Sequence, residues 1–368
     1  MINMSVKTFK DLIIEVHEKG ICQECGGCVS FCSSADYNVI GFKDPFLPPV
    51  YINQDKCLEC GICYCICPQT HILDDDINKL YKFSNFKEMP IGFIKNIYSC
   101  QAVDESFLLN GTDGGVVNSL INYLIEEKIV DGAIVAKTEA PFLRESMFAK
   151  SKDELLKASG AHLEIAPQLD GIEKFTTYTH TISELNHYKF YKLAVVGTPC
   201  QIYTIRCMQT LGVTPSENIE ICLGLFCYEN FLFDKSQIIK FEKDFNVKFE
   251  DIERINIKED LIFNLKDGKI IRIPFNYLED YMRKACYACS DFSNIYADIS
   301  FGGLGSQEKF TTILTRTDKG QDIFSKAIDA GILKCQNLNN DKKARILDII
   351  TKMARQKLNR FENFKKKL

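Results

Sequence analysis

The sequence predicts an α/β protein in which a small cysteine-rich domain precedes a larger mixed domain of strands and helices. Two observations lead to this division. Two closely spaced runs of cysteines lie near the N-terminus, and from about residue 91 short apolar strands alternate with helical segments. A third segment stands apart because it is basic and has apolar residues at helical spacing. The expected parts are therefore residues 1–90, 91–337 and 338–368.

The two cysteine runs share one spacing. CQECGGCVSFC and CLECGICYCICP both read C-x2-C-x2-C-x3-C, which is typical of bacterial ferredoxin domains with two [4Fe–4S] clusters. In such domains three thiolates of a run bind one cluster, and the fourth thiolate binds the other cluster. The two predicted ligand sets are Cys22, Cys25, Cys28 and Cys67, and Cys57, Cys60, Cys63 and Cys32. The alternative is zinc, which would favour pairs of ligands separated by a longer loop. Cys65 is surplus and is expected to be a small packed side chain.

The composition of the 368 residues narrows the possible functions. An apolar content of 46% is enough for a sizeable core, and a net charge of −4 argues against nucleic-acid binding. Seventeen cysteines could form disulfides in a secreted protein, but the N-terminal segment lacks the apolar core and cleavage site of a signal peptide. A reducing cytoplasm is therefore expected. The sequence has no apolar stretch long enough to predict a membrane span.

The middle of the chain reads as alternating strands and helices. Apolar residues at helical spacing predict a helix within 114–130, and a polar segment at 74–90 predicts a linker or a wrap-around segment. The sequence IFNLKDGKIIRIPF predicts a hairpin over 262–275 that turns at Asp267 and Gly268. Buried strands are expected within 131–137, 192–200, 219–227 and 296–305.

Eight further cysteines follow the two runs, at positions 100, 200, 207, 222, 227, 286, 289 and 335. Cys286 and Cys289 form a C-x2-C pair that could be half a zinc site, a redox dithiol or half a cluster site. Cys200 and Cys227 lie at or just after the ends of predicted strands, where α/β proteins build their sites. These four cysteines could converge on a third [4Fe–4S] cluster, although spacing alone leaves the other two possibilities open.

Four segments of the chain, in order, resemble one known family. SCQAVDESFLLNGTDGGVVNSLINYLIEEKIVDGAIVAK, VVGTPCQI, GLFC and CYACSDFSNIYADISFGGLG are similar to the family of coenzyme F420 hydrogenase/dehydrogenase beta subunits, over about residues 98–320. With two ferredoxin runs in front, the chain looks most like the F subunits of the F420H2 dehydrogenases of methanogenic archaea. The resemblance implies FAD, a third [4Fe–4S] cluster, and hydride exchange with coenzyme F420, a deazaflavin. It places the third cluster on Cys200, Cys227, Cys286 and Cys289, with Cys207 and Cys222 as spare cysteines or replacements for a neighbour.

The same resemblance implies a flavin site that is not a Rossmann site, since no G-x-G-x-x-G follows a strand. In GTDGG, glycines would let the backbone approach the ligand, and free amides at a helix start would attract a pyrophosphate. An ordinary helix start capped by Thr112 or Asp113 is the alternative. The expected FAD contacts are Thr112, Asp113, Gly114, Gly115, Val116, Asn118, Lys137, Ser159, Gly160, His162, Gly197, Thr198 and Pro199. Lys137 could equally be a solvated strand end, and His162 an ordinary loop histidine.

The resemblance also implies a mechanism. Reduced coenzyme F420 would pass a hydride to FAD, and single electrons would leave through the clusters to a ferredoxin or a larger redox complex. No catalytic acid or base is expected, because hydride transfer between ring systems depends on alignment. Lys137, Arg206 and Arg283 are expected to contact the acidic tail of the deazaflavin. Two alternatives are a related flavin and iron–sulfur reductase with another substrate, and a non-catalytic electron-transfer subunit.

The C-terminal segment carries ten Lys and Arg residues against three Asp and Glu residues over 341–368. Its apolar residues recur every three or four positions, as on one face of a helix. One interpretation is a terminal helix packed on its own domain. The other, put forward as a hypothesis, is a docking helix for an acidic partner or an anionic membrane, which would place the chain peripherally on the cytoplasmic face of a membrane complex.

Overall fold

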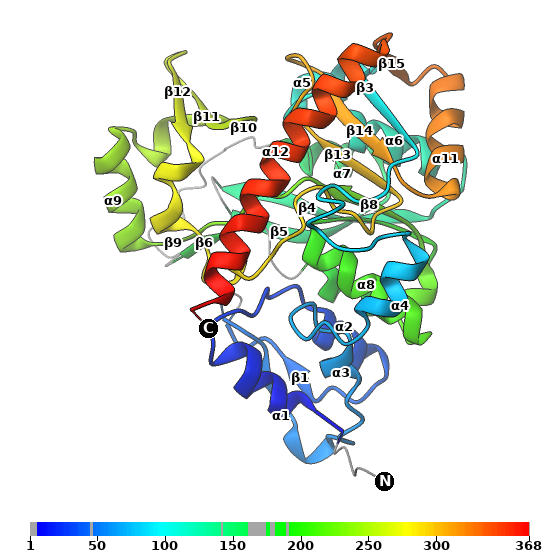
Figure 1. Ribbon diagram of the computed structural model, residues 1–368, viewed down its shortest axis with the longest axis vertical. Coiled ribbons are helices and arrows are strands. Elements are labelled where there is room, and N and C mark those ends of the chain that lie inside the picture. The colour runs from blue at the N-terminus through cyan, green and yellow to red at the C-terminus, as the bar shows by residue number, and fades with distance from the viewer. Residues whose placement is uncertain are drawn as a thin grey trace.

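The centre of the molecule is a ten-stranded mixed sheet (Figure 1). The computed structural model describes residues 6–44, 47–140, 143–160, 174–176, 181–188 and 191–367. In spatial order the strands are β15 (Leu333–Cys335), β3 (Asn96–Ala102), β14 (Thr311–Thr315), β13 (Ile299–Gly302), β8 (Ile219–Leu225), β7 (Leu193–Gly197), β4 (Gly132–Ala140), β5 (Leu143–Ala149), β6 (Lys174–Thr176) and β9 (Leu232–Asp234). The four central strands β13, β8, β7 and β4 are parallel to one another.

The central strands are buried on both faces, which explains their continuous apolar sequences. Side chains alternate across β7, so that Leu193 and Val195 belong to one core cluster and Ala194 to another. The first cluster also contains side chains of α8 (Pro199–Leu211) and of the N-terminal part. The second contains side chains of α6 (Val116–Glu126), α7 (Lys152–Lys157) and α11 (Asp318–Asp329). Helix α5 (Glu105–Asn110) lies beside this second group and contributes Phe107.

The N-terminal part contains two copies of one cysteine loop. Its regular elements are α1 (Phe9–Leu12), α2 (Gly27–Ser34), β1 (Ile40–Gly41), β2 (Val50–Tyr51) and α3 (Ile62–Cys65). In the first loop Glu24 and Gly26 have φ values of 51° and 85°, and in the second Glu59 and Gly61 have φ values of 51° and 75°. The repeated sequence CxECGxC therefore adopts a repeated backbone conformation. Glycine suits the position that begins each following helix, since a side chain is disfavoured at positive φ.

The segment at 74–90 wraps around the larger part of the molecule. It begins with α4 (Asp74–Leu80), and the hydroxyl of Tyr203 on α8 donates to the Asp74 carboxylate. The Tyr296 hydroxyl donates to Asn78 Oδ1 at 2.7 Å. One apolar cluster runs without a break from Phe9 to residues of the central sheet. Because the two parts share a core, the proposed boundary at residue 90 stays a prediction.

A separate three-stranded antiparallel sheet extends from the main sheet (Figure 1). Its strands are β10 (Ile252–Ile257), β11 (Asp260–Leu265) and β12 (Ile270–Pro274), and α9 (Lys235–Phe245) packs beside them. An aromatic-rich cluster, with Phe233, Phe241, Phe249 and Phe263 among its members, forms its core. The predicted hairpin is confirmed, with Gly268 at a φ of 83° in its turn.

Most expected elements are present with slightly different ends. Helix α6 and the strands β4, β7, β8 and β13 fall within or close to the predicted ranges.

Strands β3, β14 and β15 were not predicted. They place Cys100 and Cys335 opposite each other, and these two residues form a disulfide with a Cα–Cα distance of 4.0 Å. Reduced cysteines were expected from the sequence, and no role was predicted for this pair. Within the described part of the chain, no helix is both long and apolar enough to cross a bilayer.

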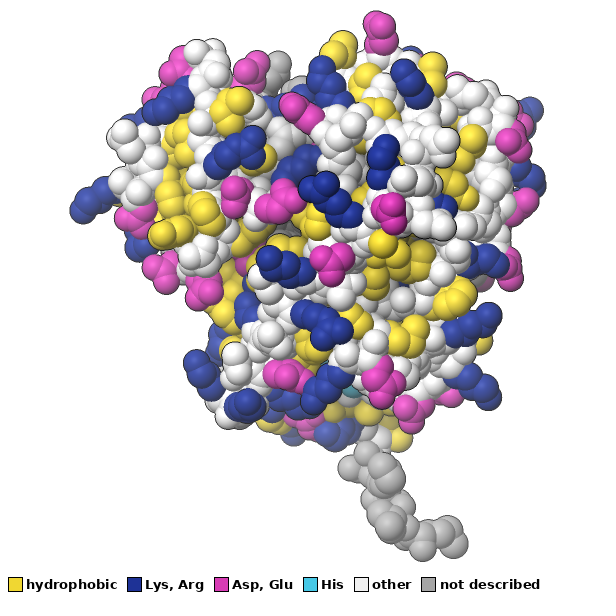
Figure 2. Space-filling model, turned by 45° about the horizontal axis from the view of Figure 1, so that its top comes forward, with side chains coloured by type: hydrophobic (Ala, Val, Ile, Leu, Met, Phe, Trp, Pro, Cys, Tyr) yellow, Lys and Arg dark blue, Asp and Glu magenta, His cyan; other side chains and the backbone are white. Residues whose placement is uncertain are grey.

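The C-terminal segment forms α12 (Asn340–Lys365), which crosses the molecule from the side of β15 to the N-terminal part (Figure 1). Its buried residues are Ile346, Ile350, Ala354 and Lys357. The first three pack in a cluster with side chains of the main sheet. The helix prediction is confirmed, but the docking hypothesis is wrong for the apolar face, because that face is already covered by the chain itself. Figure 2 shows Lys and Arg interspersed with Asp and Glu, so this side of the molecule does not present a uniformly basic surface.

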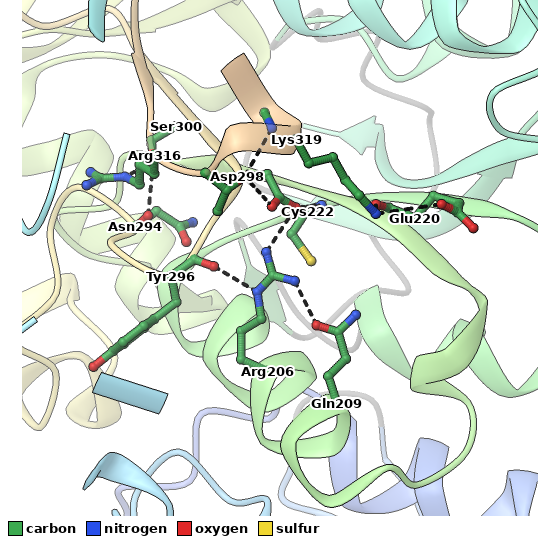
Figure 3. A network of polar contacts seen from close by, with 12 residues as sticks. Arg206, Gln209, Glu220, Cys222, Asn294, Tyr296, Asp298, Ser300, Arg316 and Lys319 are labelled. Carbon is green, nitrogen blue, oxygen red and sulfur yellow. Dashed lines mark hydrogen bonds and ion pairs between the residues drawn. The ribbon is translucent and has the colours of Figure 1, made fainter. Parts of the chain in front are cut away.

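A buried ion pair joins the elements at the centre of the sheet (Figure 3). Arg206 on α8 contacts Asp298 Oδ2 at 2.9 Å, and both side chains are about one-tenth exposed or less. Asp298 also accepts from the Cys222 amide at 2.8 Å and from the Thr317 hydroxyl at 2.8 Å. Burial by itself would raise the pKa of Asp298. The charge of Arg206 and these two hydrogen bonds outweigh burial, so the pKa lies below its ordinary value.

We expect Asp298→Asn to destabilise the protein by about 3–5 kcal/mol, because it leaves Arg206 buried without a counter-charge. The thermal unfolding midpoint, measured on anaerobically purified protein, would report this loss. Asp322→Asn is the matched control, since Asp322 pairs with Lys326 at 2.8 Å but both side chains are about 60% exposed. That control should change stability by less than about 1 kcal/mol. Equal midpoints for the two variants would contradict the central role of the buried pair.

Candidate functional site

The four cysteines of the first predicted set lie together beneath the N-terminal surface. The Cys28 thiol illustrates their proximity, since its pKa is raised first by burial and then by neighbouring thiols. Those thiols belong to Cys25, Cys22, Cys63 and Cys67. The Glu24 amide lies 3.4 Å from Cys22 Sγ, as a donor to a thiolate would. The donor set and its burial suit an iron–sulfur cluster, but the assignment of individual ligands stays a prediction.

The second set surrounds a small, mostly apolar hollow nearer the surface. Cys32, Cys57, Cys60 and Cys63 all line this hollow, together with apolar side chains such as Phe9 and Ile40. Cys60 is exposed, and the Leu58 side chain beside it is 64% exposed. Among the described residues, no three Cys, His, Asp or Glu side chains converge on a single-ion site. The thiolates of an iron–sulfur cluster bind different irons, so they surround the space that the cluster fills and do not converge on one point.

The third set assembles from three separate segments. Cys200 lies in the first turn of α8, Cys227 follows β8, Cys286 lies in α10 (Lys284–Tyr287), and Cys289 follows α10. Burial is the largest cause of the raised pKa of Cys227, about 12, and the Cys286 and Cys289 thiols raise it further. Burial also raises the pKa of the Cys200 thiol, and the Cys289 and Cys227 thiols raise it further. The Asn230 amide donates to Cys286 Sγ at 3.3 Å. The four thiols that the resemblance selected are thus neighbours in space.

The two spare cysteines lie in other surroundings. Cys222 lies in β8, and the charges that most affect its thiol are those of Arg206 and Asp298. Cys207 is buried beside Tyr203 and is influenced by Asp74. Neither residue interacts strongly with the third set in the described structure, so neither is a natural replacement for one of its members.

The first and third thiol sets meet at one threonine. Cys25 Sγ lies 3.6 Å from Thr204 Oγ1, and the same hydroxyl donates to the Cys200 carbonyl at 2.9 Å. Beside it, Arg283 forms a buried ion pair with Glu24 at 2.8 Å. Arg283 and Arg206 were expected at the mouth of a substrate site. That prediction is wrong, because both are buried and neutralised by internal carboxylates.

A cavity of about 270 Å³ lies between the GTDGG turn, the main sheet and the three-stranded sheet. Helix α6 starts at this turn, with Gly115 as its N-cap at a φ of 66°. Several predicted flavin contacts line the cavity, namely Thr112, Asp113, Gly115, Val116, Asn118 and Gly160. Apolar side chains cover much of the remaining wall, including Phe226, Tyr228, Phe231, Phe292, Phe301 and Leu304.

Other predicted contacts do not line this cavity. A Cβ on Gly114 would lie 2.7 Å from the Cys100 carbonyl oxygen, so this glycine serves backbone packing. Lys137 pairs with Glu145 at 3.3 Å, and the Ser159 hydroxyl donates to the Leu155 carbonyl at 3.0 Å. The turn of Gly197, Thr198 and Pro199 begins α8, with Thr198 and Gln201 in a capping box. His162 lies outside the described residues.

Three polar side chains on and just after β10 were not predicted from the sequence. Arg254 and Asn256 on β10 and Lys258 just after it occupy alternate positions and point to one side, towards the GTDGG turn. Arg254 and Asn256 donate to the Thr112 carbonyl. Lys258 lies 3.1 Å from Asp113 and also donates to the Gly303 carbonyl at 3.0 Å. The period-two pattern in RINIK was the available signal, but it did not reveal which turn the strand would face.

The cavity has the character expected of a flavin site. Lys258 and Arg144 line it and supply cationic groups, and Arg144 donates to the Gly160 carbonyl at 2.9 Å. Backbone amides of the glycine turn and two cations suit a pyrophosphate, and the aromatic wall suits a flat ring system. Burial raises the pKa of Asp113 despite the opposing effect of Lys258.

Comparison with known proteins identifies the family of the chain. Residues 97–173 match the N-terminal and residues 190–341 the C-terminal part of the family described as coenzyme F420 hydrogenase/dehydrogenase, beta subunit. The coenzyme F420 hydrogenase subunit beta of Methanococcus voltae is 30% identical over 273 residues, which cover 73% of this chain and 93% of the relative. A solved structure of the F420-reducing [NiFe] hydrogenase complex from Methanosarcina barkeri contains a chain with the same fold, at a TM-score of 0.62 and 24% identity. The match covers 75% of this chain and 92% of the chain in the hydrogenase complex.

Two relatives match a larger share of this chain. One is a subunit of the F420H2 dehydrogenase of Methanosarcina mazei, which is 23% identical over 86% of this chain and 85% of its own length. The other is the coenzyme F420-dependent sulfite reductase of Methanocaldococcus jannaschii, which is 27% identical over 95% of this chain and 50% of the reductase. The chain therefore belongs to the family of coenzyme F420 hydrogenase/dehydrogenase beta subunits, whose members are components of F420-dependent oxidoreductases.

Proposed function

We propose that this chain is an iron–sulfur flavoprotein that oxidises reduced coenzyme F420 and passes the electrons to a partner. The observation that carries the proposal is the position of Cys227. Its neighbours Phe226 and Tyr228 both line the cavity beside the GTDGG turn, while the Cys227 thiol belongs to the third set. One short loop after β8 therefore borders both candidate cofactor sites. When bound, FAD would supply two-electron hydride chemistry on one side and one-electron transfer to a cluster on the other.

The residues around the cavity have separable roles in this proposal. The amides of Thr112 and Gly115, with Arg144 and Lys258, would hold the pyrophosphate of FAD. Lys258 also pairs with Asp113, which holds the glycine turn against β10. The apolar wall would exclude water from the ring, which protects a hydride donor from side reactions. No side chain is assigned as an acid or a base.

The thiol sets lie in an order that supports transfer towards the surface. Thr204 separates Cys200 of the third set from Cys25 of the first set. Cys28 of the first set interacts with Cys63 of the second, and Cys60 of the second set is exposed. The exit would therefore be near Leu58 and Cys60. Its acceptor would be a cytoplasmic ferredoxin or a larger redox complex.

An anaerobic assay with a one-electron dye tests the activity directly. Protein that contains flavin and iron should oxidise reduced coenzyme F420, which is followed by the return of the deazaflavin absorbance. NADH in place of the deazaflavin is the control and should give no reaction. A fully loaded protein that fails with the deazaflavin would instead favour a related reductase with another substrate. A protein without flavin would favour an electron-transfer subunit.

Filling the cavity should remove the flavin. Ala136 lines the cavity, so Ala136→Phe should weaken flavin binding about tenfold or more, which corresponds to about 1.4 kcal/mol. The flavin-to-protein ratio after purification and the dissociation constant measured by fluorescence quenching would show this. Ala330→Phe is the matched control, because Ala330 is exposed at the end of α11. Unchanged flavin affinity in Ala136→Phe would contradict the placement.

The third thiol set can be tested by iron content. Anaerobically purified protein should contain about twelve irons per chain, from four in each cluster. Cys227→Ser should lower this value to about eight and remove one cluster signal. Cys222→Ser should retain about twelve, because Cys222 lies in the Arg206 network. A value near eight in the unmodified chain, or zinc in the third site, would rule out this cluster.

A further inference from the structure

Lys357 on α12 is a fully buried cation beside the third thiol set. Its side chain is only 1% exposed. Its ammonium donates to the Cys227 carbonyl at 2.6 Å and to the Asp291 carbonyl at 2.7 Å. Asp291 lies two residues after Cys289, so one lysine holds together two loops that each carry a cysteine of the third set.

This lysine differs from the other buried cations near the site. Arg283 is paired with Glu24 at 2.8 Å, and Arg360 is paired with Glu229 at 2.7 Å. Among the described residues Lys357 forms no ion pair, and its two hydrogen bonds go to carbonyl oxygens. A buried charge without a counter-charge is strongly destabilising. The anions that fit this position are the thiolates of the third set, because Cys289 and Cys227 are the thiols that interact most strongly with the lysine.

We propose that Lys357 raises the reduction potential of the cluster held by the third thiol set. Reduction adds one electron and no proton to a cluster, so its charge becomes one unit more negative. A positive charge in a buried, low-dielectric position favours that reduced state. The inference rests on the proposed third cluster, but it does not depend on the identity of the hydride donor.

The consequence concerns the direction of electron flow. A higher potential at the third cluster makes it a better acceptor for electrons that leave the neighbouring cavity. The basic C-terminal helix thus places Lys357 beside the third thiol set, while its apolar face fixes that residue in place through Ile350 and Ala354. The alternative is that Lys357 only braces two loops and has no effect on the potential.

Redox titrations followed by electron paramagnetic resonance separate these possibilities in the full chain. Lys357→Met removes the charge and keeps the length of the side chain, and Lys357→Gln removes the charge but keeps a hydrogen-bond donor. Both should shift the midpoint of one cluster signal to a more negative potential and leave the other two signals unchanged. Lys352→Met is the control, because it removes the same charge from an exposed position on the same helix. It should move no midpoint.

Three outcomes would overturn the inference. One is an unchanged midpoint of the third cluster in a Lys357 variant with full iron content. Another is a shift of equal size in Lys352→Met, which would indicate a general charge effect. The third is loss of the cluster from Lys357→Gln, which would identify the lysine as a structural brace. If the unmodified chain had only eight irons, by contrast, the proposal of a third cluster would itself be wrong. Iron analysis would show this before any variant was titrated.

Discussion

The buried pair of Arg206 and Asp298 holds together the segments that carry the third thiol set. Arg206 lies on α8, which carries Cys200 in its first turn. Asp298 accepts from the amide of Cys222 on β8, the strand that leads to Cys227. Arg206 also donates to the Tyr296 carbonyl, in the segment that follows Cys289. One ion pair therefore fixes the relative positions of all three segments of the third thiol set. Loss of one partner would disturb the site as well as the core, since an isolated buried charge is costly.

The core that the N-terminal part shares with the main sheet likewise fixes the positions of the thiol sets relative to one another. Electron transfer over successive sites requires fixed distances, and a flexible linker between two domains would not maintain them. Here α4 packs against α8, the apolar cluster is continuous, and the pair of Glu24 and Arg283 is buried at the junction. The polar composition of 74–90 is typical of a linker, yet its polar side chains are used in specific contacts such as that of Asn78 with Tyr296.

The features that could be predicted from the sequence are those encoded over short distances. The cysteine spacing, the helix after GTDGG, the hairpin at Gly268 and the helical tail all depend on residues close together in the chain. Arg206 and Arg283 were misplaced because their partners lie far away in the sequence, and an isolated arginine gives no sign of an internal carboxylate. The amphipathic pattern of α12 predicted an apolar face correctly, but such a pattern does not reveal which surface covers that face. The role of β10 required knowledge of a long-range contact.

The three-stranded sheet has a consequence for how this family can diversify. It forms one wall of the cavity, but its aromatic core lies mostly within itself and α9. Ile255, Ile257 and Leu261 face the cavity from this unit, whereas the twelve proposed cluster cysteines all lie outside it. If the cavity binds FAD as proposed, mutations on this wall would alter which molecule fits against the flavin without changing the distances between the thiol sets. In the proposed function, substrate choice and electron conduction would therefore depend on separate structural units, and natural selection could act on each of them independently.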